Sequence, residues 1–134
     1  MVASPASRLC PPEEFLGTPP KKGEAIRVGY VHDEAMEKHV CVDGPHPERP
    51  ERHAVIVQEM WGTGLAERCV AIKSRMASDS EILAAHSKDY VQLLKTTVGA
   101  SQRVCDRLGR KFDDDVYVCS DSFSASRLAL GCCV

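Results

Sequence analysis

Hydrophobic positions along the chain form short apolar runs separated by amphipathic stretches. The run Ile26–Val31 is rich in β-formers and predicts a buried strand, and Cys69–Lys73 predicts a second one. Pro50 and Glu51 suit the first turn of a helix, because proline is tolerated there and an acidic side chain favours the positive helix end. The apolar stripe of this helix comprises Val55, Val57, Met60 and Trp61, and Gly62 and Gly64 are expected to end it.

A second amphipathic stretch follows the second predicted strand. It begins at a capping box, in which Ser78 accepts from the third helical N–H and Glu81 reaches back. The helical pattern then runs through residues 82–94, with an interruption expected near Ser87. Residues 98–111 are polar and predict a loop.

The last part of the chain predicts one extended segment and one helix. Residues 116–119 (VYVC) read as a short extended piece, and Ser120 or Ser122 starts a final helix through Leu130. Strands and helices therefore alternate, which predicts an α/β fold with a parallel sheet covered by helices.

Residues 1–24 lack this patterning. They hold five of the eight prolines and predict a disordered leader, so that the folded domain occupies residues 25–134. Of the 134 residues, 43% are hydrophobic and 27% charged, as in soluble globular proteins. The net charge of −2 argues against direct nucleic-acid binding and against a polybasic membrane contact. No apolar run approaches the roughly 20 residues of a membrane-spanning helix, and no secretory signal is expected.

The cysteines suggest a reducing compartment. There are seven, an odd number, and no Cys-x-x-Cys pair occurs. Without a secretion signal, a disulfide framework is not expected, and buried free thiols acting as small hydrophobes explain most of them.

Some polar clusters leave two interpretations open. His39, Cys41 and His46 have ligand types that suit zinc, but a structural site needs four ligands, and a polar loop is the alternative. The Asp113–Asp115 run is either a solvated loop or a ligand contact. His86 is expected as a core histidine. Four histidines recur seven residues apart, at 32, 39, 46 and 53, but Gly44, Pro45 and Pro47 interrupt any helix, so the spacing is interpreted as chance.

Several segments, in order, resemble a known family. The stretch VGYVHDEAMEKHVCVDGPHPERPER, followed by GLAERC, AAHSKDYV and DDDVYVCSDSFSASRLALG, is similar to the start of the catalytic domain of class II zinc-dependent histone deacetylases. The resemblance runs from about Val28 to Gly131.

The resemblance implies a partial three-layer arginase/deacetylase-like α/β fold, truncated at its C-terminal side. The family reaction is zinc-dependent hydrolysis of the Nε-acetyl amide of lysine in histones or other proteins. It also implies chromatin regulation and transcription repression, a nuclear or cytoplasmic location, and possible co-repressor partners or self-association.

The family's catalytic motifs are not found in this sequence. The paired histidines after R-P-P-G, the Asp-x-His, the second Asp and the Tyr do not occur, so no catalytic or metal role is assigned and no cofactor is expected in this chain. The resemblance assigns only the rim of the acetyl-lysine channel: His46 and Pro47, with Asp115, or Asp114 if the register slips by one. Cys41 and His46 match part of a structural zinc set of some members, but Asp43 replaces the second cysteine.

The final residues, LALGCCV, are apolar, although an intact domain usually ends at its surface. We therefore expect the opening portion of a larger hydrolase, inactive by itself. The alternative is a non-catalytic binding or regulatory module that interacts with a full-length deacetylase or its partners.

Overall fold

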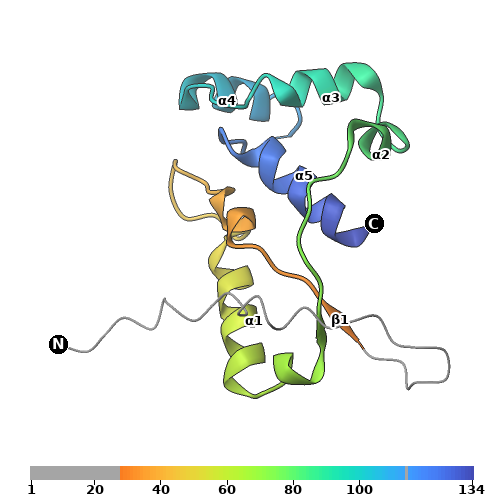
Figure 1. The fold of residues 1–134 in the computed structure, drawn as a ribbon. Coiled ribbons are helices and arrows are strands. Elements are labelled where there is room, and N and C mark those ends of the chain that lie inside the picture. The colour runs from red at the N-terminus through yellow and green to blue at the C-terminus, as the bar shows by residue number, and fades with distance from the viewer. Residues whose placement is uncertain (1–27, 114) are drawn as a thin grey trace.

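The computed structural model describes residues 28–113 and 115–134 (Figure 1). The predicted leader, residues 1–24, and the first two residues of the predicted strand Ile26–Val31 lie outside the described residues. The elements, in chain order, are β1 (Gly29–Tyr30), the 3-10 helix η3 (Glu34–Lys38), α1 (Glu51–Gly62), the 3-10 helix η4 (Ala66–Arg68), β2 (Val70–Ala71), α2 (Asp79–Leu83), α3 (Lys88–Lys95), α4 (Gln102–Gly109) and α5 (Ser122–Cys133).

The two short strands form a parallel pair. Gly29 pairs with Val70 and Tyr30 with Ala71, and the chain between them passes through η3, α1 and η4. The Ile72 side chain lies against Gly29, where a Cβ would overlap it. Both strands fall within the predicted segments, whereas residues 116–119 form no strand, so the sheet of the described residues has two strands.

Helix α1 forms where it was predicted, but Val55 of its predicted apolar stripe is exposed to solvent. Pro50 precedes its first residue, Val57 is its buried residue, and Trp61 is half-buried. The chain then turns at Gly64, whose φ of 72° favours glycine.

The helical pattern after β2 forms two short helices, α2 and α3, separated at Ser87. The capping box at Ser78 and Glu81 is present, and Arg75 donates two hydrogen bonds to the Glu81 carboxylate. These donors, Arg75 foremost, lower the pKa of Glu81 to about 2. Ser87 caps the N-terminus of α3 by accepting from the Tyr90 N–H, so the expected interruption is confirmed. His86 lies in the turn and is exposed, so its assignment to the core was wrong.

Helix α4 occupies part of the stretch that was predicted to be a loop. Its apolar face is narrow, because only Cys105, Leu108 and Gly109 are buried. Burial raises the pKa of the Cys105 thiol, which disfavours its reactive thiolate form. The six cysteines of the described residues are all free.

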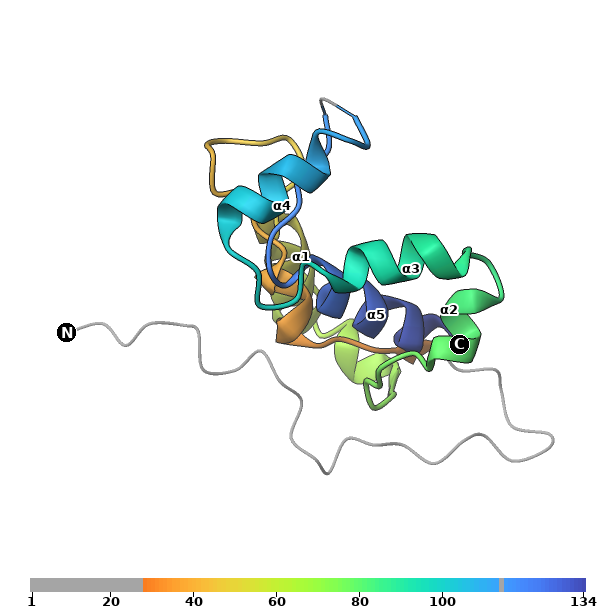
Figure 2. The same cartoon turned by 90° about the horizontal axis from the view of Figure 1, so that it is seen from above.

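Helix α5 lies at the centre of the packing and runs beside α3 (Figures 1 and 2). Ser122, Ala125, Leu128 and Gly131 recur every three residues and are buried, which lets η3 and residues 75–77 approach closely. Phe123 joins Ala77, Ile82 and Val91 in the apolar core. None of the helices in the described residues is long and apolar enough to cross a membrane.

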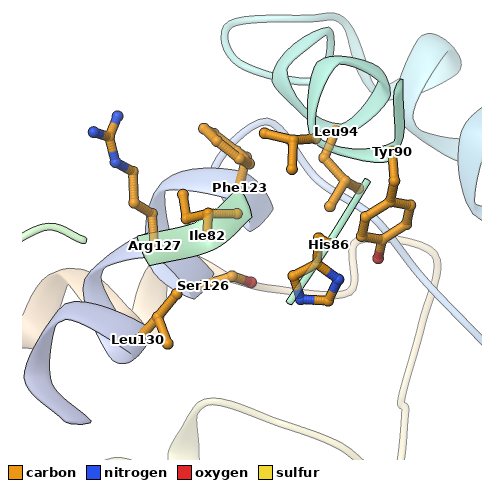
Figure 3. A pocket seen from close by; sticks show the side chains of 9 residues that line it. Ile82, His86, Tyr90, Leu94, Phe123, Ser126, Arg127 and Leu130 are labelled. Atoms are coloured by element: carbon orange, nitrogen blue, oxygen red, sulfur yellow. The ribbon is translucent and has the colours of Figure 1, made fainter. Parts of the chain in front are cut away.

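A pocket of about 280 Å³ opens beside this core, between α2, α3 and α5. Figure 3 shows the rings of His86 and Tyr90 on one side of it and Phe123 on the other. Its lining continues the apolar core toward the surface.

Candidate functional site

The loop before α1 and the segment before α5 meet although they are about 70 residues apart. Gly44, with a φ of 138°, and the prolines at 45 and 47 keep the first segment out of a helix. The two segments, with α4, enclose a pocket of about 460 Å³. It is lined by Cys41, Asp43, His46, Asp106, Gly109, Arg110, Asp113, Val116, Tyr117 and Val118.

Tyr117 is the centre of the contacts between these segments. Its ring stacks on His39, with centroids 4.4 Å apart, and meets the edge of His46 at 4.8 Å. Its hydroxyl donates to the Glu48 carboxylate. Burial, and then the hydrogen bond to Glu48 and its charge, raise the pKa of Tyr117, so the phenol stays protonated.

His39 connects Tyr117 and Glu48 to the start of α5. Its Nδ1 lies 2.9 Å from Ser122 Oγ, which also accepts from the Cys119 backbone N–H at 2.8 Å. Its Nε2 lies 3.6 Å from the Glu48 carboxylate. Burial lowers the pKa of His39 more than Glu48 raises it, so the imidazole is held neutral at pH 7.

His46 and Asp115, two of the predicted rim residues, lie together. The His46 Nε2 is 3.5 Å from an Asp115 carboxylate oxygen, while its Nδ1 accepts from the Glu48 backbone N–H at 3.1 Å. The Nδ1 also lies 3.3 Å from the Glu48 carbonyl oxygen, so the backbone of Glu48 holds the ring in place. Asp115 is 92% exposed, so the pair is well screened by water and its carboxylate is open to a ligand.

The other predicted residues are placed as follows. Pro47 is exposed in the same loop, and Asp114 lies outside the described residues. His39, Cys41 and His46 do not gather as metal ligands; both histidines contact Tyr117 instead. In the described part of the chain, three potential ligand atoms come within 4.8 Å of one another at one place, formed by His32, Glu37 and His53.

Sequence reasoning missed Tyr117, Glu48 and the His32–Glu37–His53 group. Tyr117 was interpreted only as part of an extended segment. No local signal marks its ring for this role, because the adjacent Val118 and Cys119 are both buried and show no alternation of faces. The other group joins residues from η3, α1 and the segment between β1 and η3, which no local spacing reveals.

Comparison with known proteins defines the class of this chain. The sequence model of the Histone deacetylase domain matches residues 46–134. The chain is 34% identical over 108 residues to Histone deacetylase 5 of Arabidopsis thaliana, a match that covers 78% of this chain and 16% of that protein. It is 36% identical over 84 residues to Polyamine deacetylase HDAC10 of Danio rerio, a match that covers 63% of this chain and 12% of that protein. It is 30% identical over 153 residues to human Histone deacetylase 9, a match that covers 98% of this chain and 15% of that protein.

The fold agrees with these matches. The crystal structure of the HDA15 HD domain superposes with a TM-score of 0.64 at 29% identity, over 79% of this chain and 30% of that chain. The architecture is therefore a part of the arginase/deacetylase-like α/β fold, as predicted. The chain belongs to the histone deacetylase family, and it spans between 12% and 16% of the length of the three curated relatives.

Proposed function

We propose that this chain forms the N-terminal part of a zinc-dependent deacetylase domain that hydrolyses the Nε-acetyl amide of lysine in histones or other proteins. The observation that carries the proposal is the pairing of His46 with Asp115 beside the pocket, because both match channel-rim positions of the family. Family membership and the likeness to the HD domain support it.

In this proposal, His46 and Pro47 form one wall of the acetyl-lysine channel, and Asp115 accepts a hydrogen bond from the substrate backbone. The exposure of Asp115 supports that role, since its carboxylate is open to a peptide N–H. His46 supports it too, because its Nε2 lies 3.5 Å from that carboxylate.

The residues of this chain do not fit the catalytic zinc of the family. The pocket contains Cys41, Asp43 and His46, but in the described residues these do not bring three ligand atoms together. We therefore propose that the 134 residues alone do not hydrolyse acetyl-lysine, and we assign no catalytic step to them.

The inactivity is tested by incubating the purified chain with zinc and an acetyl-lysine peptide. No turnover is expected. Turnover that a hydroxamate blocks would overturn the proposal. Sequencing the transcript beyond the codon for Val134 tests whether this chain is part of a longer, active deacetylase. That activity requires a reading frame that continues into R-P-P-G-H-H.

The rim assignment is tested in a chimaera in which residues 28–134 replace the matching segment of the HDA15 HD domain. In an active chimaera, Asp115→Asn is expected to lower kcat/KM for an acetyl-lysine peptide by roughly 10- to 100-fold, the value of a charge-assisted hydrogen bond. Asp113→Asn, in the same acidic run, is the matched control. Equal effects of the two substitutions would contradict the role of Asp115.

A second candidate function is that of a non-catalytic binding or regulatory module. For either function, we propose that the chain acts in the nucleus or the cytoplasm. The apolar core around Ala77, Ile82, Val91 and Phe123 supports it, because a fragment with its own core can present a stable surface. Co-precipitation of the chain with a full-length deacetylase or a co-repressor is expected under this candidate. If neither protein co-precipitates with the chain, the binding-module candidate is contradicted.

A further inference from the structure

Three side chains from separate parts of the chain converge after β1. His32 follows β1, Glu37 lies on η3, and His53 lies in the first turn of α1. Their ligand atoms all lie within 4.8 Å of one another. They are remote in sequence from the loop at residues 113–119, and the deacetylase proposal does not use them.

Glu37 is the bridge of this group. One of its carboxylate oxygens lies 2.9 Å from His53 Nδ1 and 3.9 Å from His32 Nε2. The two imidazole rings stack nearly parallel, with centroids 4.8 Å apart. Both rings therefore present a nitrogen to the same carboxylate.

The group is held in place by its surroundings. Asp33 caps η3 by accepting from the Ala35 N–H at 2.9 Å, and its other oxygen accepts from the Ser74 hydroxyl at 2.6 Å. This anchors η3, which carries Glu37, to the segment after β2. The site is thus built on fixed backbone at both His32 and Glu37.

The His32 nitrogen is the observation that points to a ligand. Its side chain is only 2% exposed, and Nε2 makes no hydrogen bond within the described residues. Buried polar atoms are nearly always paired, so a buried nitrogen aimed at a carboxylate and a second imidazole calls for a partner between them.

We infer that His32 Nε2, Glu37 and His53 Nδ1 form a binding site for a divalent transition-metal ion of the zinc class. Two imidazoles and a carboxylate suit Zn²⁺, Co²⁺ or Ni²⁺, whereas Ca²⁺ and Mg²⁺ prefer oxygen ligands. Three protein ligands leave the fourth tetrahedral position to water. Bond lengths of about 2.0–2.1 Å require ligand atoms roughly 3.3 Å apart. The 2.9 and 3.9 Å separations of the Glu37 oxygen from the two nitrogens bracket that value, and the nearly parallel rings must tilt for both nitrogens to face one ion.

The ion would tie together the end of β1, η3 and the start of α1. These elements otherwise meet through few buried apolar side chains, since η3 has none. Binding that is confined to the folded state raises the unfolding temperature further as the ion concentration increases.

The test uses the full 134-residue chain under reducing conditions with Co²⁺ alone. One equivalent is expected to bind and to give visible ligand-field bands without the near-ultraviolet thiolate charge-transfer band that cysteine ligands produce. Trp61, the single tryptophan, reports binding independently, because its ring contacts Tyr30, which in turn stacks on His32. Quenching of its fluorescence by Co²⁺ should saturate at the same equivalence.

Two variants locate the site. His53→Gln and Glu37→Gln are each expected to weaken Co²⁺ binding at least about tenfold and to abolish the rise in unfolding temperature with Zn²⁺. His86→Gln, at an exposed turn, and Cys41→Ser are the controls and should bind as the unaltered chain does. Circular dichroism verifies that the variants fold. Absence of Co²⁺ binding, a thiolate band, or undiminished binding in both His53→Gln and Glu37→Gln would overturn the inference.

Discussion

At the scale of single residues, Tyr117 holds the candidate site together, although it belongs to none of the candidate ligand clusters seen in the sequence. Its ring contacts both His39 and His46, and its hydroxyl donates to Glu48, the residue after Pro47. The phenol thus fixes the loop before α1 against the segment before α5. This arrangement depends on a neutral hydroxyl, because a phenolate beside the Glu48 carboxylate would repel it.

The first prediction concerns alkaline pH and Tyr117→Phe. The folded-state pKa of Tyr117 is raised above its unfolded value of about 10, so its contribution to stability is complete below pH 10 and is lost as the pH rises through the folded-state pKa. Urea unfolding at pH 8.5 and at pH 10.5 should therefore show a smaller loss of stability in Tyr117→Phe than in the unaltered chain.

Tyr90→Phe is the matched control, because Tyr90 is 38% exposed and its ring contacts are with His86 and Phe112, not with the Glu48 loop. It should leave the pH dependence unchanged. If Tyr117→Phe loses as much stability as the unaltered chain over this range, the hydrogen bond to Glu48 does not hold the phenol neutral.

The histidines illustrate what could not be predicted at this scale. Their seven-residue spacing is indeed without helical meaning, since a loop with a left-handed Gly44 interrupts it. The fold instead pairs His32 with His53 and brings His39 and His46 to Tyr117. His46 and Asp115 could be chosen from the sequence because of the family resemblance, not because spacing alone would join residues so far apart.

At the scale of elements, residues 75–77 pack closely against α5. The Ala77 N–H donates to the Arg127 carbonyl at 3.0 Å, and the Ala77 carbonyl accepts from Arg127 Nε at 2.6 Å. Gly131 makes this approach possible, because a Cβ at that position would overlap the Arg75 carbonyl and the backbone of Met76 and Ala77.

The second prediction is that Gly131→Ala destabilises the fold despite the higher helix propensity of alanine. Relieving the overlap requires a backbone shift, which costs about 1–3 kcal/mol. Gly62→Ala is the matched control on α1, where a Cβ meets nothing within 4 Å, and it should be neutral or stabilise by up to about 1 kcal/mol. Chemical denaturation measures both, and a Gly131→Ala variant as stable as Gly62→Ala would contradict the close packing.

Elements with a strong local signal were predictable, and those that depend on partners were not. The capping box at Ser78 and the proline before α1 are encoded locally, and both helices form where expected. Helix α4 was missed because its apolar stripe is limited to Cys105 and Leu108 in a polar stretch. Residues 116–119 were expected to be extended, but they form no ladder, because strand pairing depends on a partner that local sequence does not specify.

At the scale of the whole molecule, the strand pair is small for a parallel sheet. Parallel sheets are normally covered on both faces, yet Val28 is 69% and Ile72 53% exposed. The HD domain of HDA15, of which this chain covers 30%, has far more chain available to cover such surfaces. The exposed apolar side chains near β1 and β2 are therefore consistent with a part of a larger domain.

The third prediction is that the 134-residue chain self-associates through these strands. Light scattering coupled to size exclusion should show a mass that increases with protein concentration, because uncovered apolar edges associate. Ile72→Lys places a charge on this surface and should reduce the association, whereas Lys73→Arg, its exposed neighbour, should not change it. A monomer at all concentrations that unfolds cooperatively would contradict this prediction, and it would favour the binding module over an incomplete hydrolase domain.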